Sequence, residues 1–155
     1  MKKLCFLCAL CLCFAACGRE SADMGVEEAA ERVMAEYERN AFVRADEDFM
    51  EANFGAPDYV TESAVYYAQN GDDTEFGFFR LSDAKYGADM EKIIQTYIQS
   101  ERESVEALAA LYPAEELSAR LARFDGATVN TVGLTTYYVI ADAKTVKKTE
   151  NLFKN

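Results

Sequence analysis

The sequence predicts an α+β fold with one four-stranded antiparallel sheet, made of two hairpins and packed with a long central helix. Two pairs of strand-like segments, each joined by turn residues, predict the hairpins. A long amphipathic stretch between the two pairs predicts the central helix, and shorter helical stretches lie near both ends. The segments follow one another as α, ββ, α, ββ, α over residues 26–155, which we interpret as a single domain.

The first helix is predicted over residues 26–40, where apolar side chains recur at helical spacing and glutamates crowd the first turn. A second short helical piece is expected over residues 46–53. It should end at Gly55-Ala56-Pro57-Asp58, which contains two helix-breaking residues.

Both hairpins show strand segments on either side of a turn signal. Residues 62–69 and 74–81 flank Asn70-Gly71, a pair typical of tight hairpin turns. Residues 127–132 and 134–141 flank Gly133. Four strands are therefore expected.

The central helix is predicted over residues 88–112, with an apolar stripe on one face and glutamate and glutamine on the opposite face. Pro113 should end it and open a short helix over residues 114–122. Asp142 is a suitable cap for a last helix over residues 143–154.

The first 17 residues are typical of a bacterial lipoprotein signal. Lys2 and Lys3 precede an uncharged apolar run from Leu4 to Phe14, which at about 11 residues is too short for a permanent membrane span. Ala15 and Ala16 then precede Cys17, and Phe14 departs from the leucine usual at its position. We therefore expect residues 1–16 to be cleaved and Cys17 to carry the lipid.

The alternative is an ordinary secretory signal cut near Ala16, which would leave Cys17 as a free thiol. In the lipoprotein interpretation, residues 17–25 are the lipidated cysteine and a short tether. The domain would then lie close to the extracytoplasmic face of the cell membrane, held by covalent lipid.

Composition excludes several classes of function. The chain has no histidine, which rules out Ser-His-Asp and Cys-His catalysis, and all its cysteines lie within the first 17 residues. The formal net charge is −11, with the acidic excess concentrated in residues 18–75, which argues against a nucleic-acid partner. No metal or cofactor is expected.

Tyrosines on the strands are the candidate binding residues. Tyr66-Tyr67 and Tyr137-Tyr138 each place one ring on either face of the sheet, because neighbouring strand residues point in opposite directions. If one face is open, its tyrosines could form a binding platform. The alternative is that the N-terminal helix covers this face and the rings belong to the core.

Two acidic runs are weaker candidates. Asp72, Asp73 and Glu75 could hold calcium, but their spacing does not match an EF-hand, and a solvated turn is the alternative. The run that contains Asp46, Asp48 and Glu51 could serve acid–base chemistry on a glycan, or could be a solvated helix face.

Several features together resemble a known family. They are the tyrosine-rich strand, the strand that ends in Phe79-Arg80-Leu81-Ser82-Asp83, the long amphipathic helix, Tyr112-Pro113-Ala114-Glu115 and the strand Tyr137-Tyr138-Val139-Ile140. Over roughly residues 60–155 the chain is similar to small lipoproteins of Gram-positive anaerobes that are defined as a domain of unknown function, family four-three-five-eight. The resemblance implies a membrane-anchored extracytoplasmic domain and supplies no activity or catalytic residue.

The sequence thus favours a non-enzymatic lipoprotein that binds an envelope protein or a small ligand. One alternative is a one-domain solute-binding component of a transporter. The other is an envelope enzyme that uses carboxylates.

Overall fold

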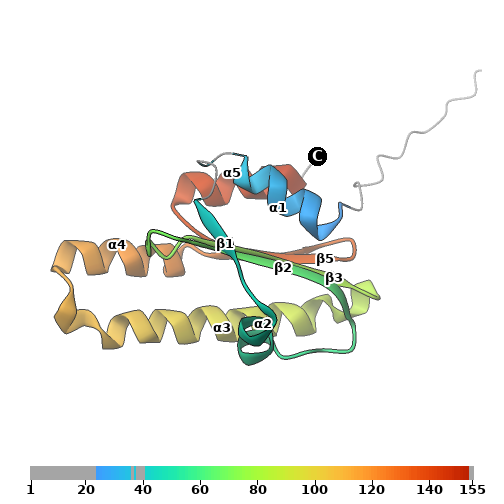
Figure 1. Ribbon diagram of the computed structural model, residues 1–155, viewed down its shortest axis with the longest axis horizontal. Coiled ribbons are helices and arrows are strands. Elements are labelled where there is room, and N and C mark those ends of the chain that lie inside the picture. The colour runs from blue at the N-terminus through green and yellow to red at the C-terminus, as the bar shows by residue number, and fades with distance from the viewer. Residues whose placement is uncertain (1–23, 36, 38–40, 154–155) are drawn as a thin grey trace, which may run out of the picture.

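The computed structural model describes residues 24–35, 37 and 41–153, and over them it is an antiparallel sheet with helices on both faces (Figure 1). The helices are α1 (Val26–Met34), α2 (Glu47–Phe54), α3 (Gly87–Ala107), α4 (Ala114–Asp125) and α5 (Ala143–Phe153), with one-turn 3₁₀ helices η1 (Ala84–Tyr86) and η2 (Ala109–Leu111) on either side of α3. The strands are β1 (Phe42–Arg44), β2 (Val60–Ala68), β3 (Glu75–Leu81), β4 (Thr128–Val132) and β5 (Thr135–Ile140). The α+β class is as predicted.

The sheet has five strands in the order β1-β2-β3-β5-β4, so the prediction of four strands is wrong in this detail. The two predicted hairpins, β2–β3 and β4–β5, are present and are joined by pairing between β3 and β5. The additional strand is β1, which pairs with the end of β2 at one edge of the sheet. Three residues are too few to show the alternation by which a strand is recognised in sequence.

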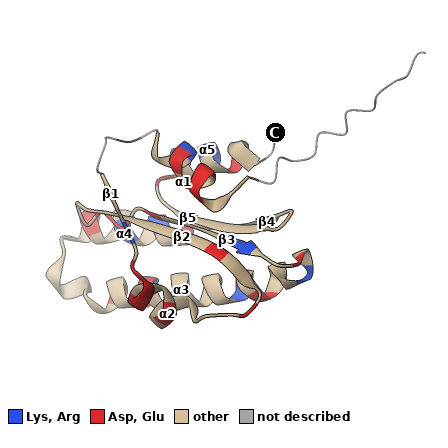
Figure 2. Cartoon of the chain, turned by 45° about the vertical axis from the view of Figure 1, so that its right-hand side comes forward, with Lys and Arg blue, Asp and Glu red and all other residues tan. Residues whose placement is uncertain are grey.

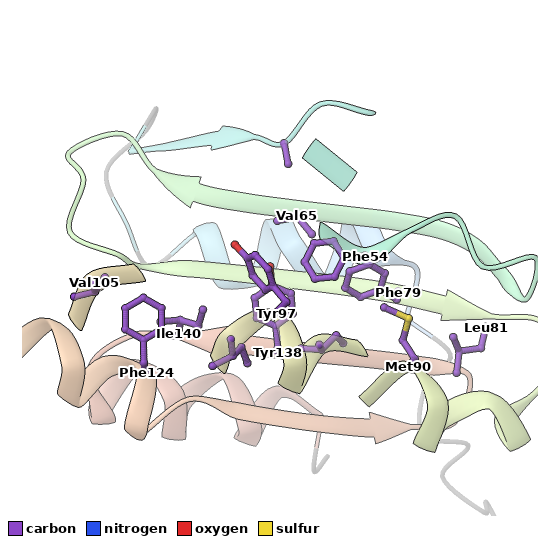
Figure 3. Packing of buried hydrophobic residues seen from close by; sticks show 13 residues of the cluster. Phe54, Val65, Phe79, Leu81, Met90, Tyr97, Val105, Phe124, Tyr138 and Ile140 are labelled. Atoms are coloured by element: carbon purple, nitrogen blue, oxygen red, sulfur yellow. The ribbon is translucent and has the colours of Figure 1, made fainter. Parts of the chain in front are cut away.

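Each face of the sheet carries its own hydrophobic core. Helices α2, α3 and α4 cover one face, where Phe54, Phe79, Met90, Tyr97 and Tyr138 belong to a single buried cluster (Figure 3). Helices α1 and α5 lie against the other face, over a second cluster that contains Phe76, Phe78 and Tyr137. This double coverage makes β3 and β5 almost continuously buried, so neither strand has a solvated face.

Local sequence explains where the helices begin and end. The side chain of Asp46 caps α2 by accepting a hydrogen bond of 2.9 Å from the backbone N–H of Phe49. Gly55 ends the same helix with a positive φ of 69°, which glycine adopts without steric cost. Helix α3 ends at Ala107, earlier than predicted, and the chain turns through η2 before Pro113 opens α4.

The predicted signal peptide, Cys17 and most of the tether lie outside the described residues. Met24 is buried in the second cluster, so the folded domain begins before α1. Over the described part of the chain, none of the helices combines the length and the apolar character needed to cross a bilayer.

Candidate functional site

The four candidate tyrosines do not form an open platform. Tyr137 is 2% exposed and Tyr138 is fully buried, so these two rings belong to the core, which was the alternative to an open binding platform. The rings are buried because both faces of the sheet are covered. The predicted N-terminal helix, α1, covers one face together with α5, and α3 covers the other face. Tyr66 is half-buried beside α1, where its hydroxyl donates to Glu27 at 3.2 Å. Tyr67, at 37%, is the most exposed of the four.

The hydroxyl of Tyr138 instead contributes to a polar cluster around Glu75. This residue opens β3, and its carboxylate accepts one hydrogen bond from the hydroxyl of Tyr97 at 2.9 Å and a second from the hydroxyl of Tyr138. Tyr97 comes from α3 and Tyr138 from β5, so three elements meet at one carboxylate. We call Glu75, Tyr97 and Tyr138 the Glu75 cluster.

Gly77 makes this geometry possible. It lies directly opposite Tyr138 in the β3–β5 pairing, and a Cβ atom built on it would lie 2.3 Å from Cε1 of Tyr138 and 2.8 Å from Cγ2 of Val65. The missing side chain leaves room for the tyrosine ring to lie across β3. Its hydroxyl can then reach Glu75, which is two residues away on the same face of the sheet.

The surroundings of Glu75 favour its neutral form. The pKa of Glu75 is raised from 4.5 to about 7, because burial and, to a smaller extent, the charge of Glu101 on α3 raise it by more than the two phenol hydrogen bonds lower it. Tyr67 is the cross-strand partner of Glu75 on β2. Burial, followed by the charge of Glu75, raises the pKa of Tyr97 and of Tyr138 well above the usual range, so both phenols stay protonated.

The turn before β3 is held by a second ionic contact. Asp73 has a positive φ of 61°, and its carboxylate accepts two hydrogen bonds of 2.5 Å from the Arg120 guanidinium on α4. The same guanidinium lies 4.4 Å from the ring centre of Tyr112. Asp73 and Glu75 therefore have partners that a solvated turn would not supply, and the turn fastens the hairpin to α4.

The acidic run of α2 borders a groove. Asp46 is the helix cap described above, whereas Glu47 and Glu51 are exposed and line a groove of about 390 Å³ between α2, residues 55–58, and the start of β2. Asp58, which is also exposed, is a third carboxylate that lines this groove. The floor is apolar, with Phe54, Phe79 and Met90 lying beneath it (Figure 3). Figure 2 shows α2 as a concentration of acidic residues, without basic ones.

No ion pair neutralises the three carboxylates of this groove within the residues that the structure describes. Asp46, Asp48 and Glu51 are not held together as a catalytic group would be, because Asp46 is occupied by the helix cap and the other two are exposed. Across residues 24–35, 37 and 41–153, no set of three carboxylates is arranged to hold a metal ion. The exposed carboxylates beside an apolar floor give the groove a negative charge.

Sequence reasoning did not find the Glu75 cluster. The acidic run Asp72, Asp73 and Glu75 predicts a turn, whereas Glu75 is the first residue of β3. The signal was the spacing Glu75-x-Gly77, which marks a polar residue and a close backbone approach on one strand face. Recognising it would have required the register between β3 and β5, which come from different hairpins.

Comparisons with known proteins give no independent indication of function. A scan against protein-family models, a search of curated proteins and a search of solved structures found no match. The similarity to family four-three-five-eight therefore stays a prediction, and function has to be argued from the geometry of the chain itself.

Proposed function

We propose that this protein is a membrane-anchored, extracytoplasmic lipoprotein that acts without catalysis and binds a cationic ligand or partner in the groove beside α2. The observation that carries the proposal is the groove itself, in which Glu47, Glu51 and Asp58 accompany an apolar floor and form no ion pair with any residue that the structure describes. Uncompensated charge beside apolar surface is typical of a recognition site, because a partner gains from both.

The expected anchor fits such a role. Lipidation at Cys17 would hold the domain at the membrane by a short tether, and a binding module does not need to diffuse. The formal net charge of −11 would attract a basic partner at long range and accelerate its association.

The two alternatives have less support. A carboxylate enzyme would use Asp46, Asp48 and Glu51, but the first is a helix cap and the others face solvent. Glu75 has a raised pKa, yet its carboxylate is occupied by the hydroxyls of Tyr97 and Tyr138 and does not line this groove. A transporter component would present a pocket that encloses a solute, whereas this groove is partly open to solvent.

Cross-linking in the protein's own cells tests the proposal. A photoreactive amino acid placed at Met50, which lines the groove, should give an adduct of defined mass in intact cells. The matched control is Lys147, an exposed residue of α5 on the opposite side of the sheet. The adduct at position 50 should disappear when Glu47 and Glu51 are both changed to glutamine. Identical adducts at positions 50 and 147, or none at position 50, would contradict the proposal.

A further inference from the structure

Strand β1 covers only part of the outer edge of β2. The pairs run from Phe42 opposite Ala68 to Arg44 opposite Tyr66, and the last contact is the backbone N–H of Ala45, which donates to the carbonyl of Val65 at 2.9 Å. The chain then leaves the edge and enters α2 (Figure 1). Within the described residues, the start of β2 therefore has a strand neighbour on one side only, which is β3.

Alternation along β2 shows which backbone groups face this open edge. Ala68 donates its N–H to Thr74, so even-numbered residues of β2 pair toward β3. The carbonyl of Val65 is taken by β1, so odd-numbered residues point outward. The N–H and C=O of Ser63 are thus directed away from β3, toward the open edge.

A charged side chain occupies part of this edge in place of a strand. The Arg44 guanidinium donates to the carbonyl of Ser63 at 3.2 Å and forms an ion pair with Glu27 at 2.7 Å. Proteins protect exposed sheet edges with charged side chains of this kind. Arg44 is half exposed, so it can withdraw when another group takes its place at Ser63.

The groove of the preceding subsection lies at the same place. Val60 and Ser63 line it from β2, and Glu47 and Glu51 line it from α2. A side chain from a strand added beside Ser63 would enter the groove on the side of α2. A lysine or arginine there would lay its aliphatic stem on the apolar floor and bring its charge to the carboxylates.

We propose that the open edge of β2 and the adjoining groove bind an extended, lysine- or arginine-bearing segment of a partner protein, which adds to the sheet as a further strand. Main-chain hydrogen bonds to Ser63 supply part of the affinity, and the basic side chains in the groove supply specificity. The inference deepens the proposed function, on which it rests, by naming the occupant of the same groove.

The test uses a capped seven-residue peptide in which lysine alternates with threonine, titrated into the lipid-free domain by calorimetry. Ser63→Pro removes the outward N–H without touching the ladder to β3, since Ser63 and Phe79 form a non-hydrogen-bonded pair by the alternation above. Ser63→Ala is the matched control, because it keeps the N–H. We expect Ser63→Pro to weaken binding about 10-fold and Ser63→Ala less than about 2-fold.

A second measurement guards against misfolding of the proline variant. Two versions of the same peptide carry N-methyl groups, one on the odd-numbered residues and the other on the even-numbered residues. Each version lacks the N–H groups along one edge of the extended peptide, so the version that is blocked on the edge facing β2 should bind the unaltered protein about 10-fold more weakly. Replacing lysine by glutamate in the peptide should abolish binding.

Four results would overturn strand addition. They are unchanged affinity for the folded proline variant, equal affinity for both N-methylated peptides, binding of a free polyamine as tight as that of the peptide, and no binding of the peptide at all. In each case the cross-link at position 50 would still decide the proposed function separately, because it reports occupation of the groove by any partner.

Discussion

Glu75→Gln should make the protein more stable at neutral and alkaline pH. Glutamine has the shape of the protonated glutamic acid and stays neutral at every pH, so it mimics the form that the buried site favours. Its carbonyl can accept from one of the two phenols, Tyr97 or Tyr138, and its amide can donate to the other. The substitution therefore removes the charge and preserves the packing of the Glu75 cluster.

The size of the effect follows from the two pKa values. The folded-state pKa of Glu75 is raised to about 7 from an ordinary value of 4.5, and each unit corresponds to about 1.4 kcal/mol. Below pH 4.5 both states hold the proton. Between pH 4.5 and 7 the folded state holds more proton than the unfolded state, so the free energy of unfolding falls as pH rises. Above pH 7 the loss is complete, at about 3 kcal/mol.

Urea unfolding of both proteins from pH 4.5 to 8.5 measures this directly. The free energy of unfolding of Glu75→Gln, minus that of the unaltered protein, should grow from near zero to about 3 kcal/mol, and the subtraction cancels titrations common to both. Glu115→Gln, at an exposed position of α4, controls for the loss of one negative charge. A difference that is constant over this range, or negative at pH 8, would refute the raised pKa of Glu75.

Three other substitutions test the packing around the site. Gly77→Ala should destabilise the domain by about 1–3 kcal/mol in urea unfolding, because the new methyl group would overlap the ring of Tyr138; an unchanged midpoint would contradict the close contact. Asp73→Asn should cost about 2 kcal/mol by loss of the charge-assisted pair with Arg120, and a double-mutant cycle with Arg120→Met should return a coupling energy of similar size. Phe54→Ala should cost about 3–5 kcal/mol of unfolding free energy in thermal or urea unfolding, because this ring lies in the core. It should also weaken binding of the lysine peptide, because the same ring lines the groove. Unchanged peptide affinity in the folded variant would contradict binding of the peptide in this groove.

Much of the fold could be predicted because its signals are local. Asn70-Gly71 and Gly133 mark hairpin turns, and the apolar stripe that contains Met90, Ile94 and Tyr97 marks α3. These patterns depend on residues at most a few turns apart. The end of α3 was less accurate, because exposed Leu108 and Leu111 continue the apolar pattern through η2 without being buried.

The features that were missed depend on distant parts of the chain. Whether Tyr137 is covered depends on the docking of α1 and α5, and whether Tyr138 reaches the carboxylate of Glu75 depends on Gly77 and Tyr138 meeting across β3 and β5. Strand β1 is too short to carry a pattern and exists because Phe42 packs against Phe76 of β3, with ring centres 4.9 Å apart. Such contacts are fixed by tertiary packing and not by local sequence.

The groove was only half visible in the sequence. The acidic run of α2 was noted as a candidate, but its apolar floor is assembled from β3 and α3 as well as from α2. The open edge of β2 could not be predicted, since it is created by the early end of β1.

The most direct test of a membrane-anchored binding protein is the intact mass and membrane partitioning of the protein from its own cells, beside a Cys17→Ala variant. We predict cleavage before Cys17, a mass gain equal to a diacylglyceryl group, and recovery with the membrane, all of which the variant loses. An unmodified protein released freely into the medium would contradict the anchor.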